Sequence, residues 1–209
     1  MKQTILITGS TDGIGYETAK LLVAQGHHVL IHGRSQVKLE KVSAELSALA
    51  NESSAQIESY QADLSNFDEV KKLASAILKN HTSLDILINN AGILKTSNPI
   101  TPSGLDIRFV VNTLSPYLLT RLLLPVMSNH GRVVNLSSAA QAPINLEALS
   151  GKVQFHDHMA AYAQSKLAIT IWTQSLAHEL KNNGPSIIAV NPGSLLASKM
   201  VKEGFGLPG

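Results

Sequence analysis

The first fifteen residues place a short apolar run directly before three closely spaced glycines. Thr4–Thr8 has the composition of a buried parallel strand, and Gly9, Gly13 and Gly15 follow at once. Glycine permits a tight turn and a close approach of backbone to a bound group, although it also serves purely structural turns. A helix beginning here offers unpaired N–H groups and the positive end of its dipole to an anion. The pattern predicts a strand, a phosphate-binding turn and a helix, and it indicates a dinucleotide ligand.

Strand-like and helix-like patterns alternate along the rest of the chain. This alternation predicts an α/β fold, a single doubly wound parallel sheet of the Rossmann type with helices on both faces, as one domain over residues 1–209. The expected strands are Thr4–Thr8, His28–His32, Gln56–Gln61, Leu84–Asn89, Arg132–Leu136 and Ser186–Val190. The expected helices are Gly13–Gln25, Gln36–Ala50, Asn66–Lys79, Gly104–Met127 and Ala160–Lys181. Two loops, Gln141–Met159 and Pro192–Gly209, follow strands at the edge where parallel sheets bind ligands.

Composition narrows the class of protein. A net charge of +2 with 15% charged residues gives no basic stripe, so nucleic acid is not an expected partner. The chain has no cysteine, which excludes a disulfide scaffold, a thiolate nucleophile and a cysteine metal site. The first strand follows Met1 closely and no apolar stretch looks long enough to cross a bilayer, so we expect a cytoplasmic protein without a membrane partner.

Tyr162 and Lys166 lie four residues apart in a predicted helix, so both side chains share one face. A nearby ammonium favours the phenolate and is expected to lower the tyrosine pKa from its usual value of about 10, which suits proton transfer. The alternative is a buried tyrosine beside a solvated lysine.

Four other positions can be interpreted as local structural features such as caps, turns or loops. Asn112 lies within the predicted helix Gly104–Met127, where asparagine normally marks a cap or a distortion. Asn89–Gly92 has the composition of a turn, and Asp63 that of a cap for a following turn. Pro192–Gly193 is a common loop signal.

Taken in order along the chain, these segments resemble the short-chain dehydrogenase/reductase family over nearly the whole length. The interval between Ser138 and Tyr162 is longer than is usual in this family. Its extra loop and the run Asn112–Thr120 resemble those of the retinol-dehydrogenase-like branch. The matching segments are Thr8–Gly15, Asp63–Leu64, Asn89–Gly92, Asn112, Ser137–Ser138, Tyr162–Lys166 and Asn191–Gly193.

The resemblance implies roles for the matching residues. Tyr162 would donate a proton to a carbonyl oxygen, Lys166 would also hold the nicotinamide ribose, and Ser138 would bond the substrate oxygen while Ser137 satisfies backbone groups. Asn112 would help to hold a water that relays protons to Lys166. The implied cofactor-binding set is Gly9, Ser10, Thr11, Gly13, Ile14, Gly15, Arg34, Ser35, Asp63, Leu64, Asn90, Ala91, Gly92, Tyr162, Lys166, Pro192 and Gly193.

The end of the second strand bears on the choice of cofactor. An acidic residue there binds the ribose 2′-hydroxyl of NAD, whereas an arginine accommodates the 2′-phosphate of NADP. Gly33 occupies the acidic position and Arg34 follows, which favours NADP. Asp12 in the glycine turn argues the other way, so NAD is the alternative.

A metal is not expected. His156 and His158 flank Asp157, but a zinc site needs further ligands at suitable spacing, and the remaining histidines show no such pattern. The three residues are expected in a solvated or pocket-lining loop.

The substrate side is expected in the loop over residues 137–162 and the tail over 193–209. Ile144, Leu146, Leu149 and Phe155 supply apolar surface for a pocket wall. The chain ends soon after Gly193, so the usual last strand is expected to be absent unless a tail has been omitted.

The sequence therefore predicts an NADP-dependent oxidoreductase acting on the carbonyl or alcohol group of a small, apolar molecule. The alternative is a dinucleotide-sensing or regulatory protein that keeps the fold without turnover. The assembly could be a homodimer.

Overall fold

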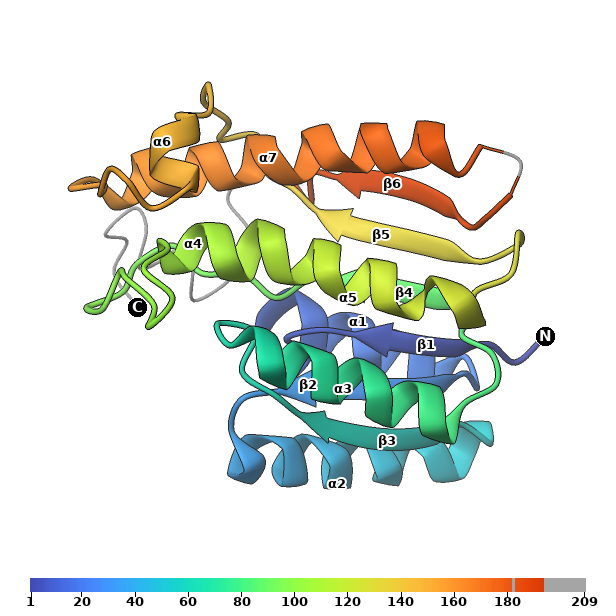
Figure 1. Cartoon of the computed structure of the whole chain (residues 1–209). Helices are drawn as coiled ribbons and strands as arrows, with labels where there is room; N and C mark the ends of the chain where they lie inside the picture. The colour runs from blue at the N-terminus through green and yellow to red at the C-terminus, as the bar shows by residue number, and fades with distance from the viewer. Residues whose placement is uncertain (182, 194–209) are drawn as a thin grey trace.

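Six parallel strands form one sheet in the order β3-β2-β1-β4-β5-β6 (Figure 1). The computed structural model describes residues 1–181 and 183–193, so the prediction about the last strand lies outside the described residues. The strands are β1 (Thr4–Ile7), β2 (His28–Gly33), β3 (Gln56–Gln61), β4 (Ile86–Asn89), β5 (Arg132–Leu136) and β6 (Ser186–Val190). The predicted doubly wound parallel sheet is confirmed.

The strand order reverses between β1 and β4, which are neighbours at the centre of the sheet. In doubly wound sheets, loops separate at such a reversal and leave a crevice at the carboxyl ends of the strands. The glycine turn follows β1, so the fold places it in this crevice.

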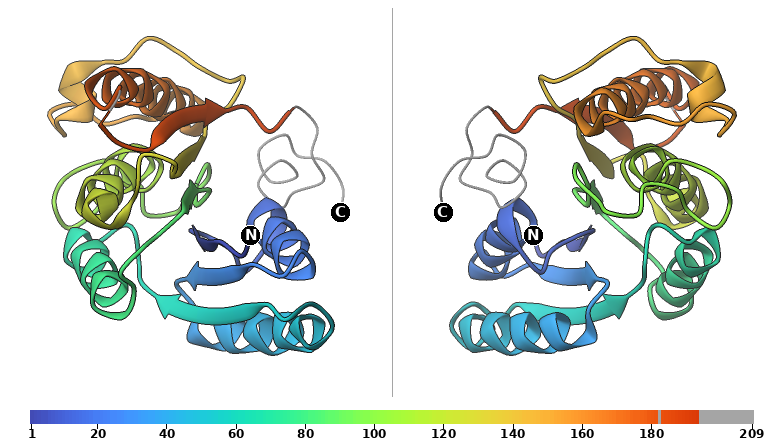
Figure 2. Two further views of the ribbon diagram at one scale, coloured as in Figure 1. Left: turned by 90° about the vertical axis from the view of Figure 1, so that its right-hand side faces the viewer. Right: turned by 90° about the vertical axis from the view of Figure 1, so that its left-hand side faces the viewer.

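The central strands β1 and β4 are mostly apolar because both faces of the sheet are covered. Ile5 and Ile7 of β1 pack into one hydrophobic cluster with α1 (Gly13–Ala24) and α2 (Gln36–Ser53). Leu6 points the other way, into a cluster with α3 (Phe67–Asn80), α5 (Ser115–Leu123) and α7 (His158–Glu179). Figure 2 shows these two helical layers on opposite sides of the sheet.

The predicted helix Gly104–Met127 is wrong as a single element. It is a series of four segments: α4 (Ile107–Phe109), the π-helical turn η1 (Val110–Leu114), α5 and the 3₁₀ turn η2 (Leu124–Val126). The π-helical turn holds Asn112, the residue whose propensity indicated a distortion.

The predicted loop Gln141–Met159 is also more ordered than expected. It contains the short helix α6 (Leu146–Leu149), and α7 already begins at His158. The Asp157 carboxylate caps α7 by accepting hydrogen bonds from the backbone N–H groups of Met159 and Ala160.

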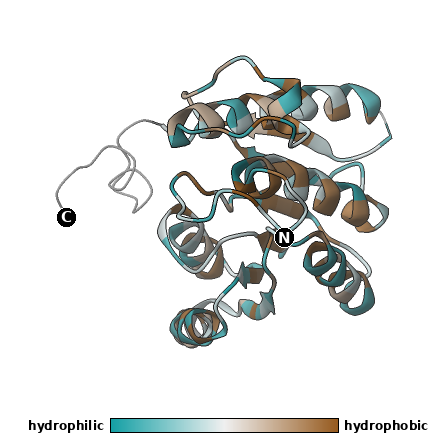
Figure 3. Cartoon of the chain, turned by 60° about the vertical axis from the view of Figure 1, so that its left-hand side comes forward, coloured by the Kyte–Doolittle hydropathy of each residue, from teal (hydrophilic) through white to brown (hydrophobic). Residues whose placement is uncertain are grey.

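One segment, Ile107–Val126, is long and apolar enough to cross a membrane, contrary to the sequence-based expectation. Its most apolar window is 56% buried inside the protein, as befits the central helical run between α3 and α7. Figure 3 shows hydrophobic colour concentrated on this run and on the strands. The apolar character of the segment is accounted for by the core.

Polar side chains cross-link the middle of this core. The side-chain amide of Asn89 on β4 donates to Asn135 Oδ1 at 2.8 Å and to Thr120 Oγ1 at 3.0 Å. The amide of Asn135 on β5 donates to Thr173 Oγ1 on α7 at 2.8 Å. All four residues are buried, so each hydrogen bond offsets a desolvation cost.

We expect Asn135→Ala to lower the free energy of unfolding by about 3 kcal/mol, because it leaves a cavity and removes bonds from two buried partners. Urea unfolding followed by circular dichroism measures the change. The exposed Asn129→Ala is the matched control and should shift stability by less than about 0.5 kcal/mol. Equal stability of wild type and Asn135→Ala would contradict this account of the core.

Candidate active site

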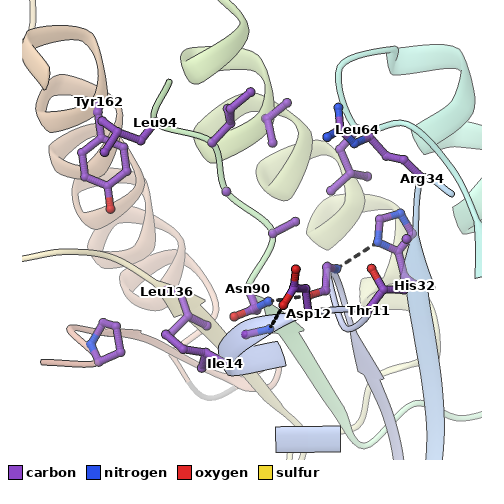
Figure 4. Close-up of a pocket in the computed structure, with 18 of the residues that line it drawn as sticks. Thr11, Asp12, Ile14, His32, Arg34, Leu64, Asn90, Leu94, Leu136 and Tyr162 are labelled. Carbon is purple, nitrogen blue, oxygen red and sulfur yellow. Dashed lines mark hydrogen bonds between the residues drawn. The ribbon is translucent and has the colours of Figure 1, made fainter. Parts of the chain in front are cut away.

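A cavity of about 440 Å³ lies at the carboxyl ends of the central strands (Figure 4). Its walls come from the glycine turn, the ends of β2 and β3, the turn after β4 and the face of α7. Of the residues predicted for the site, those lining it are Gly9, Thr11, Gly13, Ile14, Arg34, Asp63, Leu64, Asn90, Ala91, Gly92, Tyr162, Lys166 and Pro192. The fold brings together residues that are far apart in the sequence.

The glycine turn is tightly packed. Gly9 and Gly13 have φ angles of +64° and +55°, which side chains rarely adopt. Gly15 does not line the cavity, but a Cβ there would lie 2.3 Å from the carbonyl oxygen of Gly9. The first two glycines therefore shape the turn, and the third allows the helix to pack against it.

Asp12 and Asn90 hold the two sides of this turn. The Asp12 carboxylate caps α1 by accepting from the Gly13 N–H at 2.8 Å. The Asn90 amide donates to the carbonyl oxygens of Thr8 and Gly9 at 2.9 and 3.0 Å. The turn after β4 thus fixes the turn after β1.

His32 is a site residue that sequence reasoning missed, because a histidine within a strand pattern carries no distinguishing signal. It is 2% exposed, and its Nδ1 accepts from the Gly9 N–H at 3.1 Å while its Nε2 lies 3.1 Å from the Ala62 carbonyl oxygen. These partners require a neutral ring with the proton on Nε2. Burial lowers the pKa of His32 to about 4.

Ser10, Ser35 and Gly193, predicted as cofactor ligands, do not line the cavity. Ser10 is fully buried and exchanges hydrogen bonds with the backbone of His32. Ser35 caps α2 through the Lys38 N–H, and Gly193 forms an exposed turn with Asn191. Their polar groups are engaged by local structure.

The end of β2 carries two cations. Arg34 and Lys38 both line the cavity and are solvent-exposed. Sequence reasoning missed Lys38, which the first turn of α2 places beside Arg34. Asp63 also lines this end, and one of its oxygens accepts from the Ser65 N–H at 2.9 Å, which is the turn-capping role considered for it.

Tyr162 and Lys166 reach the cavity from adjacent turns of α7. Lys166 Nζ lies 5.7 Å from the centre of the Tyr162 ring and donates to the Leu136 carbonyl oxygen at 2.7 Å. Figure 4 places Tyr162 and Arg34 at opposite ends of the cavity. The alternative interpretation, in which the lysine side chain is solvated, is wrong because Lys166 is only 4% exposed.

The expected lowering of the tyrosine pKa is also wrong. Burial raises the pKa of Tyr162, and the nearby Ser138 side chain acts in the opposite direction. Burial lowers the pKa of Lys166 to about 8. Desolvation outweighs the attraction between the two groups, so the phenol is protonated and the amine charged at neutral pH.

The two serines after β5 have different surroundings. Ser137 lines the cavity wall, but its hydroxyl is bonded to the Lys166 carbonyl oxygen at 3.1 Å and to Thr170 Oγ1 at 2.7 Å. Ser138 is not in the lining, and its Oγ accepts from the Ala140 N–H while contacting the Tyr162 phenol. Ser138 is thus the serine beside the proton donor.

Asn112 is fully buried and does not line the cavity. Its amide bonds both backbone groups of Ile93, at 2.8 and 2.9 Å, and donates to Ser165 Oγ at 2.9 Å. With these partners the side chain positions the turn after β4 against α7. Its predicted part in a water relay to Lys166 stays a prediction.

The apolar loop residues expected in the pocket wall do not line this cavity. Ile144, Leu146, Leu149 and Phe155 are all absent from the cavity lining. Phe155 packs on Phe109 with ring centres 5.9 Å apart, and Leu146 is 72% exposed. The tail over residues 194–209, the other part of that prediction, lies outside the described residues.

The segment His156–Asp157–His158 has a structural role. Asp157 is the cap of α7, and His158 Nδ1 accepts from the buried Arg108 at 2.7 Å. The start of α7 is therefore joined to α4.

Comparisons with known proteins match the chain over nearly its whole length. Residues 3–205 match the family profile described as short chain dehydrogenase. Retinol dehydrogenase 12 of Bos taurus is 36% identical over 97% of this chain and 64% of its own length, and human polyprenol dehydrogenase is 35% identical over 90% and 59%. The chain thus spans about three fifths of the length of these relatives.

Solved structures described as short-chain oxidoreductases or dehydrogenases are also similar to this chain. A metagenomic short-chain oxidoreductase in complex with NADP has a TM-score of 0.75 at 31% identity, covering 92% of this chain and 82% of that one. A Shigella flexneri protein described as a putative short chain dehydrogenase complexed with NADP has a TM-score of 0.78 at 28% identity, covering 99% and 83%.

We expect the stability of the protein to fall between pH 7 and pH 5 partly because of His32. Its folded pKa of about 4 lies below its unfolded value of about 6.5, so the unfolded chain binds more protons as pH falls from 6.5 towards 4. This linkage removes about 2 kcal/mol by pH 5. Urea unfolding at both pH values should show a smaller loss for His32→Gln than for wild type. The exposed His130→Gln is the control and should keep the wild-type pH dependence.

Proposed function

The chain belongs to the short-chain dehydrogenase family, and we propose that it transfers hydride between NADP(H) and the carbonyl or alcohol group of a small, apolar molecule. One observation carries the proposal: Tyr162 and Lys166 open onto the same cavity as the glycine turn. A non-catalytic dinucleotide sensor would need the turn but not the buried pair.

The residues around the cavity suit a nicotinamide dinucleotide. The first-turn amides of α1 have no carbonyl partners within the helix, and the glycine turn keeps side chains away from them. Arg34 and Lys38 would hold the adenine-ribose end, and Lys166 the nicotinamide ribose. The bound cofactor supplies or accepts the hydride.

The proton is handled by the chain itself. Because burial raises the pKa of Tyr162, the phenol keeps its proton at neutral pH and can donate it to a carbonyl oxygen during reduction. The Lys166 ammonium then stabilises the phenolate that forms, in a site where burial strengthens the interaction. The Ser138 side chain favours the ionised phenol, so its hydroxyl is placed to stabilise charge on the same oxygen.

An apolar substrate agrees with the apolar part of the cavity lining. Ile93, Leu94, Val111 and Leu136 all line the cavity onto which Tyr162 opens, and Figure 4 draws Leu94 and Leu136 among its lining residues. The relatives named retinol dehydrogenase and polyprenol dehydrogenase are named for alcohols of large apolar content. A cytoplasmic location, a homodimer and the absence of membrane and nucleic-acid partners stay predictions from the sequence.

NADP is the proposed cofactor because of the charges at the end of β2. Gly33 has no side chain, and Arg34 and Lys38 give this end two positive charges. Asp12 and Asp63, which also line the cavity, oppose them, but the Asp12 carboxylate accepts from the Gly13 N–H as a helix cap and the Asp63 carboxylate accepts from the Ser65 N–H. Both NADP-complexed neighbours have the same fold, which supports the assignment.

Tyr162→Phe should lower kcat for carbonyl reduction by about 100-fold to 10,000-fold, because it removes the proton donor while keeping the ring. The Kd of NADPH should stay within about threefold of wild type. Stopped-flow assays with apolar aldehydes and ketones, and fluorescence titration of NADPH, measure the two quantities. Tyr117→Phe, an exposed tyrosine on α5, is the control. Tight NADPH binding by a wild-type protein that reduces none of these compounds would instead favour the sensor.

Arg34→Ala and Lys38→Ala should each weaken NADPH by about 10-fold to 100-fold and NADH by much less, since a charged hydrogen bond contributes about 1.5–3 kcal/mol. Titration of both cofactors separates the effects. Lys41→Ala removes an equally exposed cation from the same helix and should change neither affinity. Equal losses for NADPH and NADH would show that this end does not bind the 2′-phosphate.

A further inference from the structure

A second group of polar side chains lies at the amino end of β2, away from the strand ends that form the cavity. His28 begins β2, Glu58 lies within β3, and His81 is the C-cap of α3. His28 Nε2 is 2.9 Å from Glu58 Oε1, and His81 Nε2 is 3.2 Å from Glu58 Oε2. One potential ligand atom from each residue lies within 4.8 Å of the others.

The sheet register creates this group. His28 pairs with Gln56 and Leu30 with Glu58, so His28 and Glu58 project from the same face of neighbouring strands. Leu30 packs in the cluster that also holds Leu73 and Ile77 of α3. The same packing brings the end of α3, with His81, over the two strands. His28 and His81 are 53 positions apart in the sequence (81 − 28), so the three residues converge without any local motif.

We propose that His28, Glu58 and His81 bind a divalent transition-metal ion, with zinc as the best-matched ion. Two imidazole nitrogens and one carboxylate form a known zinc ligand set, which leaves a fourth position for water. The histidine side chains are 15% and 10% exposed and the Glu58 side chain is 39% exposed, so the site is sheltered but open to solvent through the carboxylate.

The distances between the ligands suit a tetrahedral ion. Zinc bonds of about 2.05 Å at tetrahedral angles place neighbouring ligand atoms about 3.3 Å apart and the two ring centres about 5.2 Å apart. His28 Nε2 lies 2.9 Å from Glu58 Oε1 and His81 Nε2 lies 3.2 Å from Glu58 Oε2, while one ligand atom from each of the three residues lies within 4.8 Å of the others. The ring centres are 5.4 Å apart with an interplanar angle of 61°. Small shifts of the side chains would admit the ion.

Tyr60 completes the surroundings of the carboxylate. Its hydroxyl donates to Glu58 Oε2 at 2.9 Å and lies 3.0 Å from His81 Nε2. A hydroxyl in this position orients a metal-binding carboxylate as an outer-shell partner. The site would tie α3 to β2 and β3 and shares no residue with the proposed oxidoreductase site.

The competing account is a hydrogen-bonded cluster in which Glu58 pairs with the two histidines without a metal. Metal binding separates the two. The full chain, freed of metal with a chelator, is titrated with ZnCl₂ by calorimetry, and Co²⁺ is used as a spectroscopic probe of tetrahedral geometry. We expect one Zn²⁺ per chain with a Kd below about 10 μM, and a rise in Tm on binding. Cysteine is absent from the sequence, so thiolates cannot contribute to the signal.

Glu58→Gln and the double variant His28→Gln/His81→Gln should bind Zn²⁺ at least about 100-fold more weakly, because even outer-shell changes cost 10-fold to 100-fold. His130→Gln, an exposed histidine outside the group, should bind as wild type. Circular dichroism checks that each variant folds. Glu58→Gln keeps the size of the side chain, so it remains informative if the double variant does not fold.

Two results would overturn the proposal. The first is binding of Zn²⁺ by Glu58→Gln as tightly as by wild type. The second is a wild-type protein that gives no tetrahedral Co²⁺ spectrum at millimolar metal. In either case the three residues form a hydrogen-bonded cluster only, and the assignment of the oxidoreductase site is unaffected.

Discussion

Several backbone groups of the loops at the carboxyl edge of the sheet have no backbone partner in the strands, and side chains form hydrogen bonds with them. His32 accepts from the Gly9 N–H, Asn90 donates to the Thr8 and Gly9 carbonyl oxygens, and Asn112 bonds both backbone groups of Ile93. An unpaired buried backbone group costs as much as a lost hydrogen bond. These residues therefore hold the loops around the cavity in place, although Asn112 itself does not line it.

At the same edge of the sheet, the burial of Lys166 lowers the stability of the fold. Lys166 is almost fully buried, and its lowered pKa records the penalty of desolvating an ammonium. The Leu136 carbonyl oxygen compensates in part, through a hydrogen bond of 2.7 Å. The lysine stays charged at neutral pH and the phenol of Tyr162 stays protonated, which is the combination that the proposed carbonyl reduction needs.

The two ends of the sheet carry different sets of polar groups. Backbone amides, Arg34 and Lys38 gather at the carboxyl ends, where an anionic dinucleotide fits. Imidazole nitrogens and a carboxylate gather near the amino end of β2, where a cation fits. None of the three residues of the proposed metal site lines the cavity, so the two proposed sites share no residue.

The sequence by itself determined the features that depend on local physics. The apolar run of β1 predicted a buried strand, the glycine spacing predicted a tight turn into a helix, and Asn112 indicated the distortion that proved to be a π-helical turn. The resemblance to the short-chain dehydrogenase/reductase family pointed to many of the residues that line the cavity; most of these follow strand ends, whereas Tyr162 and Lys166 lie on α7.

Only the tertiary structure decided the rest, because it depends on register and burial. The bonds of His32 and the convergence of His28 with Glu58 follow from which strands pair and in what register, which no local pattern records. The raised pKa of Tyr162 follows from burial, whereas spacing suggested the effect of a neighbouring charge. Desolvation depends on every element packed around a group, so its magnitude exists only once the chain has folded.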